Sequence, residues 1–176
     1  MTNTPSGTIR LFAVGNARIE TPVAVIEPSA ELAFATALYF LLERREPVSR
    51  RALERLLWPD IAQATASHRM RQTLLKLRRL GVPVETVGTA RLRIPPDLAF
   101  VDVEDLIAAP RQIERVAASH LVILPHYDPQ VSDQYTDWLE SRKHEIVRLP
   151  KVSEGSEWTA HGRKDAPAEC NVRTRR

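Results

Sequence analysis

The residues of this sequence best suited to chemistry are the cations between Ala64 and Gly81. The segment ATASHRMRQTLLKLRRLG carries six basic or potentially basic side chains: His68, Arg69, Arg71, Lys76, Arg78 and Arg79. No acidic residue lies between Asp60 and Glu85, although opposite charges three or four residues apart would stabilise a surface helix. Guanidinium and ammonium groups neutralise the phosphates of nucleic acids. The segment therefore predicts a helix that binds an anionic partner.

A helical wheel of about 100° per residue divides this segment into two faces. The apolar face is expected to pack inward, and it consists of Met70, Leu74 and Leu77, with Thr73 and Leu80 at its edge. The opposite face consists of His68, Gln72, Leu75 and Arg79, flanked by Arg71 on one side and by Arg69 and Lys76 on the other. Glutamine and arginine hydrogen-bond to adenine and guanine edges in the major groove of DNA. Arg78 lies close to the apolar side, and its place in LLKLRR favours a structural ion pair.

The segments before this helix predict a small sheet and then helices. Short apolar runs over residues 9–26, interrupted by the Gly-Asn pair at 15–16, predict two or three antiparallel strands. Ser29 is the expected N-cap of a first helix, which ends at the arginine pair at 44–45. Ser49 is the expected N-cap of a second helix, and WPD at 58–60 is expected to end it.

The basic helix comes third, and a hairpin follows it. The helix is expected to begin between residues 65 and 67 and to stop at Gly81, a favourable C-cap residue. Residues 84–87 and 91–94 then predict a small β-hairpin. In the second strand Arg91 and Arg93 alternate with apolar residues, so one hairpin face can be cationic while the other packs. An arginine there can reach an adjacent minor groove.

The C-terminal part of the chain predicts helices and a polar tail. Residues 111–120 are expected to be helical, LPHYDP at 124–129 to be a loop, and residues 131–147 to form a longer helix. The sequence beyond Pro150 is polar and aperiodic, so it is expected to be disordered.

Composition restricts the class of protein. The chain has 176 residues and a formal net charge of +3, so the position of the charge is more informative than its total. It has no run of about 18 apolar residues, so we expect no membrane span, and MTNTPSGTIR carries no recognisable secretory signal. The single cysteine, Cys170, excludes a disulfide within the chain and favours a cytoplasmic location.

Other candidate sites are weak. HEIVR at His144 lacks the second histidine of a zinc-protease helix, and His120 and His126 have no ligand partners at useful spacing. The acids at 102, 104 and 105 fall at a predicted helix start, where capping explains them better than catalysis. Trp58 and Trp138 are expected to be packing residues. There is no glycine-rich loop of the kind that holds nucleotides. With none of these candidates supported, we expect no enzymatic activity, no cofactor and no metal ion.

Several segments together resemble the N-terminal half of SARP-type bacterial transcriptional activators. The segments are PVSRRALERLLWPD, LLKLRRLG, ARLRI, VDVEDL, the opening IRLFAVGNARIE, and HLVILPHYDPQVSDQYTDWLESRKHEIVRL. The resemblance spans residues 9–149. It implies an α+β fold: an OmpR/PhoB-type winged helix-turn-helix DNA-binding domain over residues 1–96, with an N-terminal antiparallel sheet, three helices and a C-terminal hairpin wing. A partial, TPR-like activation module over 97–149 and a tail over 150–176 would follow.

The resemblance also implies which residues contact DNA. The recognition helix would be residues 67–80, and its DNA-facing side chains would be His68, Arg69, Arg71, Gln72 and Lys76, with Arg79 at the backbone end and Arg91 on the wing. WPDIAQATAS at 58–67 matches the loop by which relatives approach RNA polymerase. The implied partners are double-stranded DNA, as direct repeats near a promoter, and RNA polymerase, with a homodimer on DNA as one arrangement. No phosphoacceptor domain of the OmpR type is expected.

A second function remains open from the residues themselves. The basic helix would also suit a protein-interaction module that docks on an acidic protein partner, with the C-terminal helices as its working surface. Steep salt dependence and sequence preference would favour DNA over that alternative.

Overall fold

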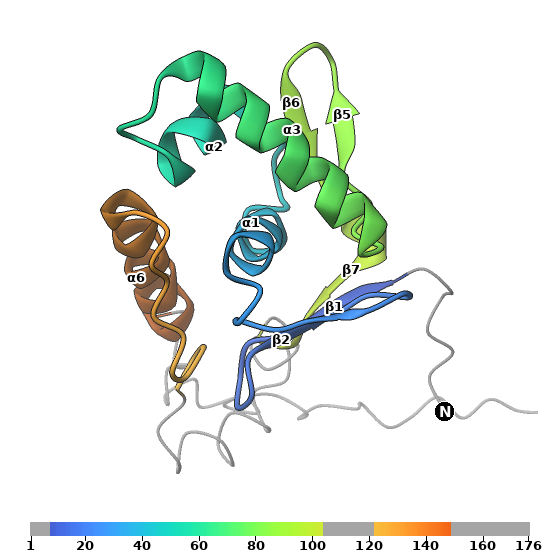
Figure 1. Cartoon of the computed structure of the whole chain (residues 1–176). Helices are drawn as coiled ribbons and strands as arrows, with labels where there is room; N and C mark the ends of the chain where they lie inside the picture. Colours follow the sequence, from blue (N-terminus) through green and yellow to red (C-terminus); the bar gives the residue numbers. More distant parts are fainter. Residues whose placement is uncertain (1–7, 104–121, 149–176) are drawn as a thin grey trace, which may run out of the picture.

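The computed structural model describes residues 8–103 and 122–148, which form a mixed α+β structure (Figure 1). The elements, in chain order, are β1 (Ile9–Phe12), β2 (Arg18–Glu20), β3 (Val25–Ile26), α1 (Glu31–Leu42), β4 (Val48–Ser49), α2 (Arg50–Leu57), α3 (Gln63–Arg79), β5 (Glu85–Val87), β6 (Arg91–Arg93), the short 3-10 helix η1 (Pro96–Leu98), β7 (Ala99–Val101) and α6 (Asp133–Arg148). The predicted α+β class is confirmed. The helix predicted at 111–120, the tail from residue 150, and His120, Glu104, Asp105 and Cys170 lie outside the described residues.

The three N-terminal strands belong to a four-stranded sheet. β1 and β2 pair antiparallel, and Gly15 lies in the turn between them with a φ of 79°, so the predicted antiparallel strands are confirmed. The sheet has the order β3-β2-β1-β7, and β7 joins it parallel to β1. The sequence patterns did not predict that last pairing.

The acid at 102 has a role in addition to the predicted one. The carboxylate of Asp102 accepts hydrogen bonds from the backbone N–H groups of Ala13 and Val14, at 2.9 and 3.1 Å. These N–H groups follow β1, beyond the register in which β7 pairs with it. Asp102 therefore satisfies backbone donors at the end of a strand, a role that the predicted capping of its own helix did not include.

Helix α1 lies at the centre of the structure, between the four-stranded sheet and the α2–α3 pair, with α6 on its flank (Figure 1). Residues 33–38 are buried without interruption, as expected for a helix that is covered on all sides. Its N-cap is Ala30, which makes no side-chain capping bond. The prediction of Ser29 as N-cap is therefore wrong by one residue. The chain turns before the helix through a hydrogen bond from Ala30 N–H to the Glu27 carbonyl at 2.9 Å.

The second sheet has the order β4-β6-β5 and contains the predicted hairpin. β5 pairs with β6 antiparallel, and Leu92 and Ile94 are buried as the alternation predicts. β4 was not predicted. It pairs with β6 through Val48 opposite Leu92, and so attaches the hairpin to the start of α2.

Side-chain hydrogen bonds attach helix α6 to α1 and to the residue that follows α1. The hydroxyl of the fully buried Tyr135 donates a hydrogen bond to the carbonyl of Ala35 at 2.8 Å. Glu43, just after α1, accepts from Trp138 Nε1 at 2.8 Å and from Arg142 Nε at 2.7 Å. Burial raises the pKa of Glu43, but the hydrogen bonds from Arg142 and Trp138 outweigh burial, so this pKa lies below the ordinary value.

One hydrophobic core runs through the described residues. It includes the interior of both sheets and of α1–α3, and also Val101, Val103, Tyr135 and Leu139. Residues on both sides of the predicted boundary between 96 and 97 belong to this core. The division into residues 1–96 and 97–149 stays a prediction. In the described part of the chain, no helix is both long enough and apolar enough to cross a membrane.

Candidate nucleic-acid interface

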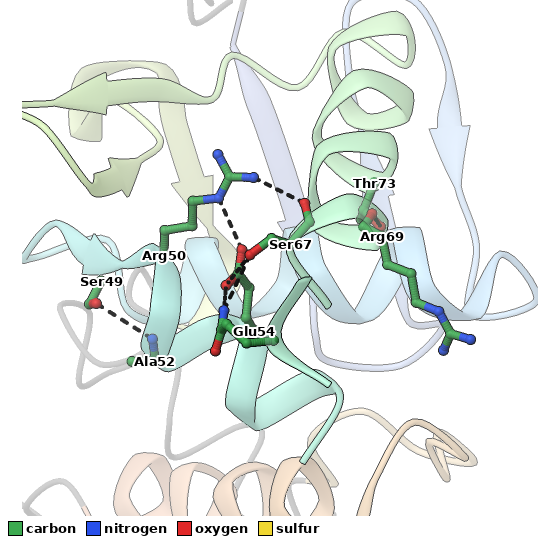
Figure 2. Close-up of polar contacts among 8 residues, drawn as sticks. Ser49, Arg50, Ala52, Glu54, Ser67, Arg69 and Thr73 are labelled. Carbon is green, nitrogen blue, oxygen red and sulfur yellow. Dashed lines mark hydrogen bonds and ion pairs between the residues drawn. The ribbon is translucent and has the colours of Figure 1, made fainter. Parts of the chain in front are cut away.

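Helices α2 and α3 are joined by a hydrogen-bonded cluster around Glu54 (Figure 2). Glu54 lies in α2 and is 3% exposed. Its carboxylate accepts hydrogen bonds from Arg50 Nε at 3.1 Å, from Ser67 Oγ at 3.1 Å and from Gln63 Nε2. Two of these donors belong to the first turns of α3, so the buried carboxylate is satisfied only when the two helices keep this arrangement.

Arg50 extends this cluster to the hairpin. Its side chain pairs with Glu54 and donates to the carbonyl of Ser67 at 3.3 Å. Its backbone N–H donates to the carbonyl of Ala90, in the hairpin turn, at 3.0 Å. A single residue at the start of α2 thus contacts both α3 and the β5–β6 hairpin, and fixes their relative positions.

Helix α3 begins earlier than the sequence predicted. Its first residue is Gln63 and its N-cap is Ala62, which makes no side-chain capping bond, whereas we expected a start between 65 and 67. The loop between α2 and α3 therefore covers only residues 58–62, and the rest of the WPDIAQATAS stretch is helical. The physical reason is the Glu54 cluster, because Gln63 and Ser67 bond to the carboxylate from adjacent turns of one helix.

The end of α3 agrees with the prediction. Gly81 has a φ of 81°. Its backbone N–H donates to the carbonyl of Arg78, and the backbone N–H of Val82 donates to the carbonyl of Leu77. This is the Schellman arrangement, in which glycine takes the left-handed conformation after the last helical residues. The helix therefore stops where the sequence indicated.

The two predicted faces of α3 are present. The buried residues are Ala66, Met70, Thr73, Leu74 and Leu77. The exposed ones include all six side chains of this helix that were predicted to face DNA: His68, Arg69, Arg71, Gln72, Lys76 and Arg79. In Figure 2 the guanidinium of Arg69 points away from the Glu54 cluster. The inward packing and the outward cations follow from the same periodicity.

The cations of this face are not neutralised within the described residues. The ion pairs that join two described residues involve Arg18, Arg50, Arg93, Arg142 and Lys143, and none involves a cation of α3. The prediction of a structural ion pair for Arg78 is therefore wrong. Arg78 is exposed, and α3 itself contains no acid that could pair with it. Arg78 adds to the cationic face instead.

Helix stability explains only part of this charge. Lys76, Arg78 and Arg79 lie in the last turn, where cations interact favourably with the helix dipole. Arg69 and Arg71 lie in the interior of the helix, beyond the reach of either terminus. Both are exposed and neither has an ion-pair partner among the described residues, so two guanidinium groups are available for an anion.

The hairpin presents one free cation in the described part of the chain. Arg91 is exposed, while Arg93 pairs with Glu85 across the two strands. The expected cationic face of the hairpin is thus reduced to Arg91. Because Arg91 pairs in register with Ser49, at the N-terminus of α2, it lies beside the helix pair.

Sequence reasoning missed the residues that position this surface. Glu54, Gln63 and Arg50 were assigned no role, although a signal was present: Arg50 and Glu54 have the i, i+4 spacing of an ion pair, and Glu54 lies in the same turn as the buried Leu53 and Leu57. The partner on α3 could not be inferred, because it depends on how the helices cross.

The remaining candidates are peripheral to this surface. Among residues 8–103 and 122–148, no group of three His, Cys, Asp or Glu side chains could hold a metal ion. His144 is exposed on α6, as predicted, and His126 is exposed in the predicted loop, with a φ of 61°. Trp58 is buried and Trp138 packs against Tyr135, so both are packing residues, as expected.

A comparison of the chain with models of protein families, with curated proteins and with solved structures finds no match in any of the three.

Proposed function

We propose that this protein binds double-stranded DNA as a winged helix-turn-helix, and that it regulates transcription in the manner of the SARP-type activators it resembles in sequence. In this proposal α3 enters the major groove, α2 braces it, and the β5–β6 hairpin is the wing on the adjacent minor groove or backbone. The observation that carries the proposal is the face of α3: exposed arginines, a lysine and an amide, without a carboxylate and without ion pairs among the described residues.

The roles of the individual side chains follow from their chemistry. Arg71 and Gln72 are the groups suited to bidentate hydrogen bonds with guanine and adenine edges. Arg69, Lys76 and Arg79 are suited to phosphates on either side of the groove, which gives affinity rather than sequence preference.

The hairpin would supply the remaining contact. Arg91 is a single exposed arginine beside the helix pair, the residue type that narrow minor grooves attract. His68, near the start of the exposed face, would contact the backbone or a base edge. The Glu54 cluster would preorganise these contacts, because it holds α3 without using any of the side chains that would face DNA.

Higher levels of organisation are also part of the proposal. Direct repeats would be bound by two copies of the chain, and the short loop at residues 58–62 together with the following turns of α3 would be the surface that approaches RNA polymerase. These statements rest on the sequence resemblance alone. The alternative, an acidic protein as the partner of the same basic face, has no geometric observation in its favour over DNA.

The test begins with selection of bound fragments from a random duplex pool with the full chain. We expect one enriched sequence, a steep decrease of affinity with salt, and weak binding to a scrambled duplex. Arg71→Ala and Gln72→Ala should each relax base preference by about 1–3 kcal/mol at one position. Lys76→Ala should weaken binding to every duplex alike and reduce the slope of log K against log salt by about 0.9.

The outcomes separate the two functions. Recovery of no sequence, with little affinity for any duplex, would reject DNA binding and leave the acidic protein partner. If a sequence were enriched but base preference were unchanged in both the Arg71 and the Gln72 variants, DNA binding would stand and the assigned face of α3 would be wrong.

A further inference from the structure

The exposed face of α3 holds one large apolar side chain among its polar groups. Leu75 is 42% exposed, and its neighbours at i−4, i−3, i+3 and i+4, which surround it on the helix surface, are Arg71, Gln72, Arg78 and Arg79. All four are exposed. An exposed leucine by itself is ordinary. The informative feature is its position beside Arg71 and Gln72, the two groups proposed to read bases, and between cations proposed to lie against the duplex.

The major groove offers a single kind of apolar target. The edges of guanine, adenine and cytosine present hydrogen-bond donors and acceptors there, whereas thymine adds the methyl group on C5. A leucine pressed against the polar edges would remove water from them without replacing its hydrogen bonds, which is unfavourable. Contact with a methyl group instead buries apolar surface on both sides. Leu75 is therefore suited to a 5-methylpyrimidine.

We propose that Leu75 is a specificity-determining residue that contacts the 5-methyl group of a pyrimidine, which is thymine in unmodified DNA. This inference rests on the proposed DNA binding. Gln72 lies three residues earlier on the same face and suits adenine, so we expect an A·T pair under residues 72–75 of the bound helix. A second source of the same methyl group is 5-methylcytosine, and the experiment distinguishes the two.

The test uses the full chain and the duplex that it selects. Each thymine is replaced in turn by deoxyuridine, which lacks only the 5-methyl group, and Kd is measured for the unmodified protein and for Leu75→Ala. We expect one position at which uridine weakens binding of the unmodified protein about fourfold, the effect of one buried methyl group. At that position Leu75→Ala should bind the thymine and uridine duplexes equally.

A second comparison isolates the methyl group from the rest of the base. Cytosine and 5-methylcytosine are placed at the same position, opposite guanine. If the methyl group alone is read, methylation should restore affinity by about the same fourfold factor in the unmodified protein but not in Leu75→Ala. If the methyl group changed Kd in the thymine–uridine comparison but not in the 5-methylcytosine–cytosine comparison, thymine would be recognised through O4 as well. If the methyl group changed Kd equally in the unmodified protein and in Leu75→Ala, the role of Leu75 would be overturned.

Two variants serve as controls. Leu75→Met keeps an apolar side chain of similar volume and should retain the uridine effect. Val25→Ala removes another exposed apolar side chain, 56% exposed on β3 of the other sheet, and should bind like the unmodified protein. Because both sites are exposed, thermal unfolding should change little, and this measurement excludes a folding defect.

Three results decide the matter. A uridine effect that disappears only in Leu75→Ala supports the inference. A uridine effect that is equal in the unmodified protein and in Leu75→Ala, or that occurs at no thymine, overturns this inference and leaves the proposed function intact. A chain that selects no duplex at all overturns the proposed function, and this inference with it.

Discussion

Replacement of Glu54 by glutamine is a direct test of the cluster that positions α3. Glutamine has nearly the same shape, but one of its two terminal atoms is an NH2 donor rather than an acceptor. In the cluster the two carboxylate oxygens receive donors from Arg50 on one side and from Gln63 and Ser67 on the other. With Arg50, Gln63 and Ser67 oriented as they are in the structure, at least one donor faces another donor whichever way the new amide turns.

The expected magnitude follows from the burial of the groups involved. A hydrogen bond to a charged group contributes about 1.5–3 kcal/mol when its partner is buried, and Glu54 is 3% exposed. Arg50 is 33% exposed, so water can replace part of its lost interaction, and the retained amide oxygen keeps part of the cluster. We therefore expect Glu54→Gln to lower the free energy of unfolding by about 2 kcal/mol, well below the sum for three bonds.

The assay is urea unfolding of the full chain at neutral pH, followed by far-ultraviolet circular dichroism. The midpoint should fall while the m-value stays constant, because the surface exposed on unfolding does not change. Arg55→Gln, at the next position of α2 and on its exposed side, is the matched control and should stay within about 0.5 kcal/mol of the unmodified protein. If Glu54→Gln behaved like this control, the carboxylate would not be what holds the two helices.

Four other substitutions test the surrounding fold. Gly81→Ala should destabilise the protein by about 2 kcal/mol, because φ is 81° and the new Cβ would lie 3.0 Å from a valine methyl group. Gly88→Ala, with a φ of 63° and nothing within 4 Å, should cost only about 1 kcal/mol; equal losses in urea unfolding would contradict the close-contact argument. Tyr135→Phe should cost about 1 kcal/mol through its bond to the Ala35 carbonyl, and no change in the same assay would exclude that bond. The lowered pKa of Glu43 contributes stability that is fully present above the ordinary glutamate pKa and is lost as pH falls through the lowered pKa. The stability difference between the unmodified protein and Glu43→Gln should therefore shrink over that acidic range, and a difference that is constant with pH would refute the linkage.

Local sequence patterns were sufficient to predict several elements and the way they pack. The period of the apolar residues in α3 identified Met70, Leu74 and Leu77 as its inner side, and the outward position of the cations followed from that phase. Ser49 as the N-cap of α2 and Gly81 after α3 were also predictable. Such features depend on residues within a few positions of one another, so the sequence contains the complete physical cause.

Features with partners distant in the chain were not predictable in this way. The parallel pairing of β7 with β1, the role of Asp102 at the end of β1 and the attachment of β4 to the hairpin each join segments that are far apart in sequence. The early start of α3 has the same origin, because the donors on its first turns are held by the carboxylate of Glu54 on another helix.

The distribution of free charge also depended on the folded chain. Counting residues shows that Arg78, Arg91 and Arg93 are cations, but not which of them has a partner. Cross-strand register brings Glu85 to Arg93 and leaves Arg91 exposed, and the absence of acids on α3 leaves Arg78 exposed as well. Composition and periodicity therefore specified a basic helix. The positions of distant carboxylates, which only packing determines, specified which of its charges and those of the hairpin remain available to a partner.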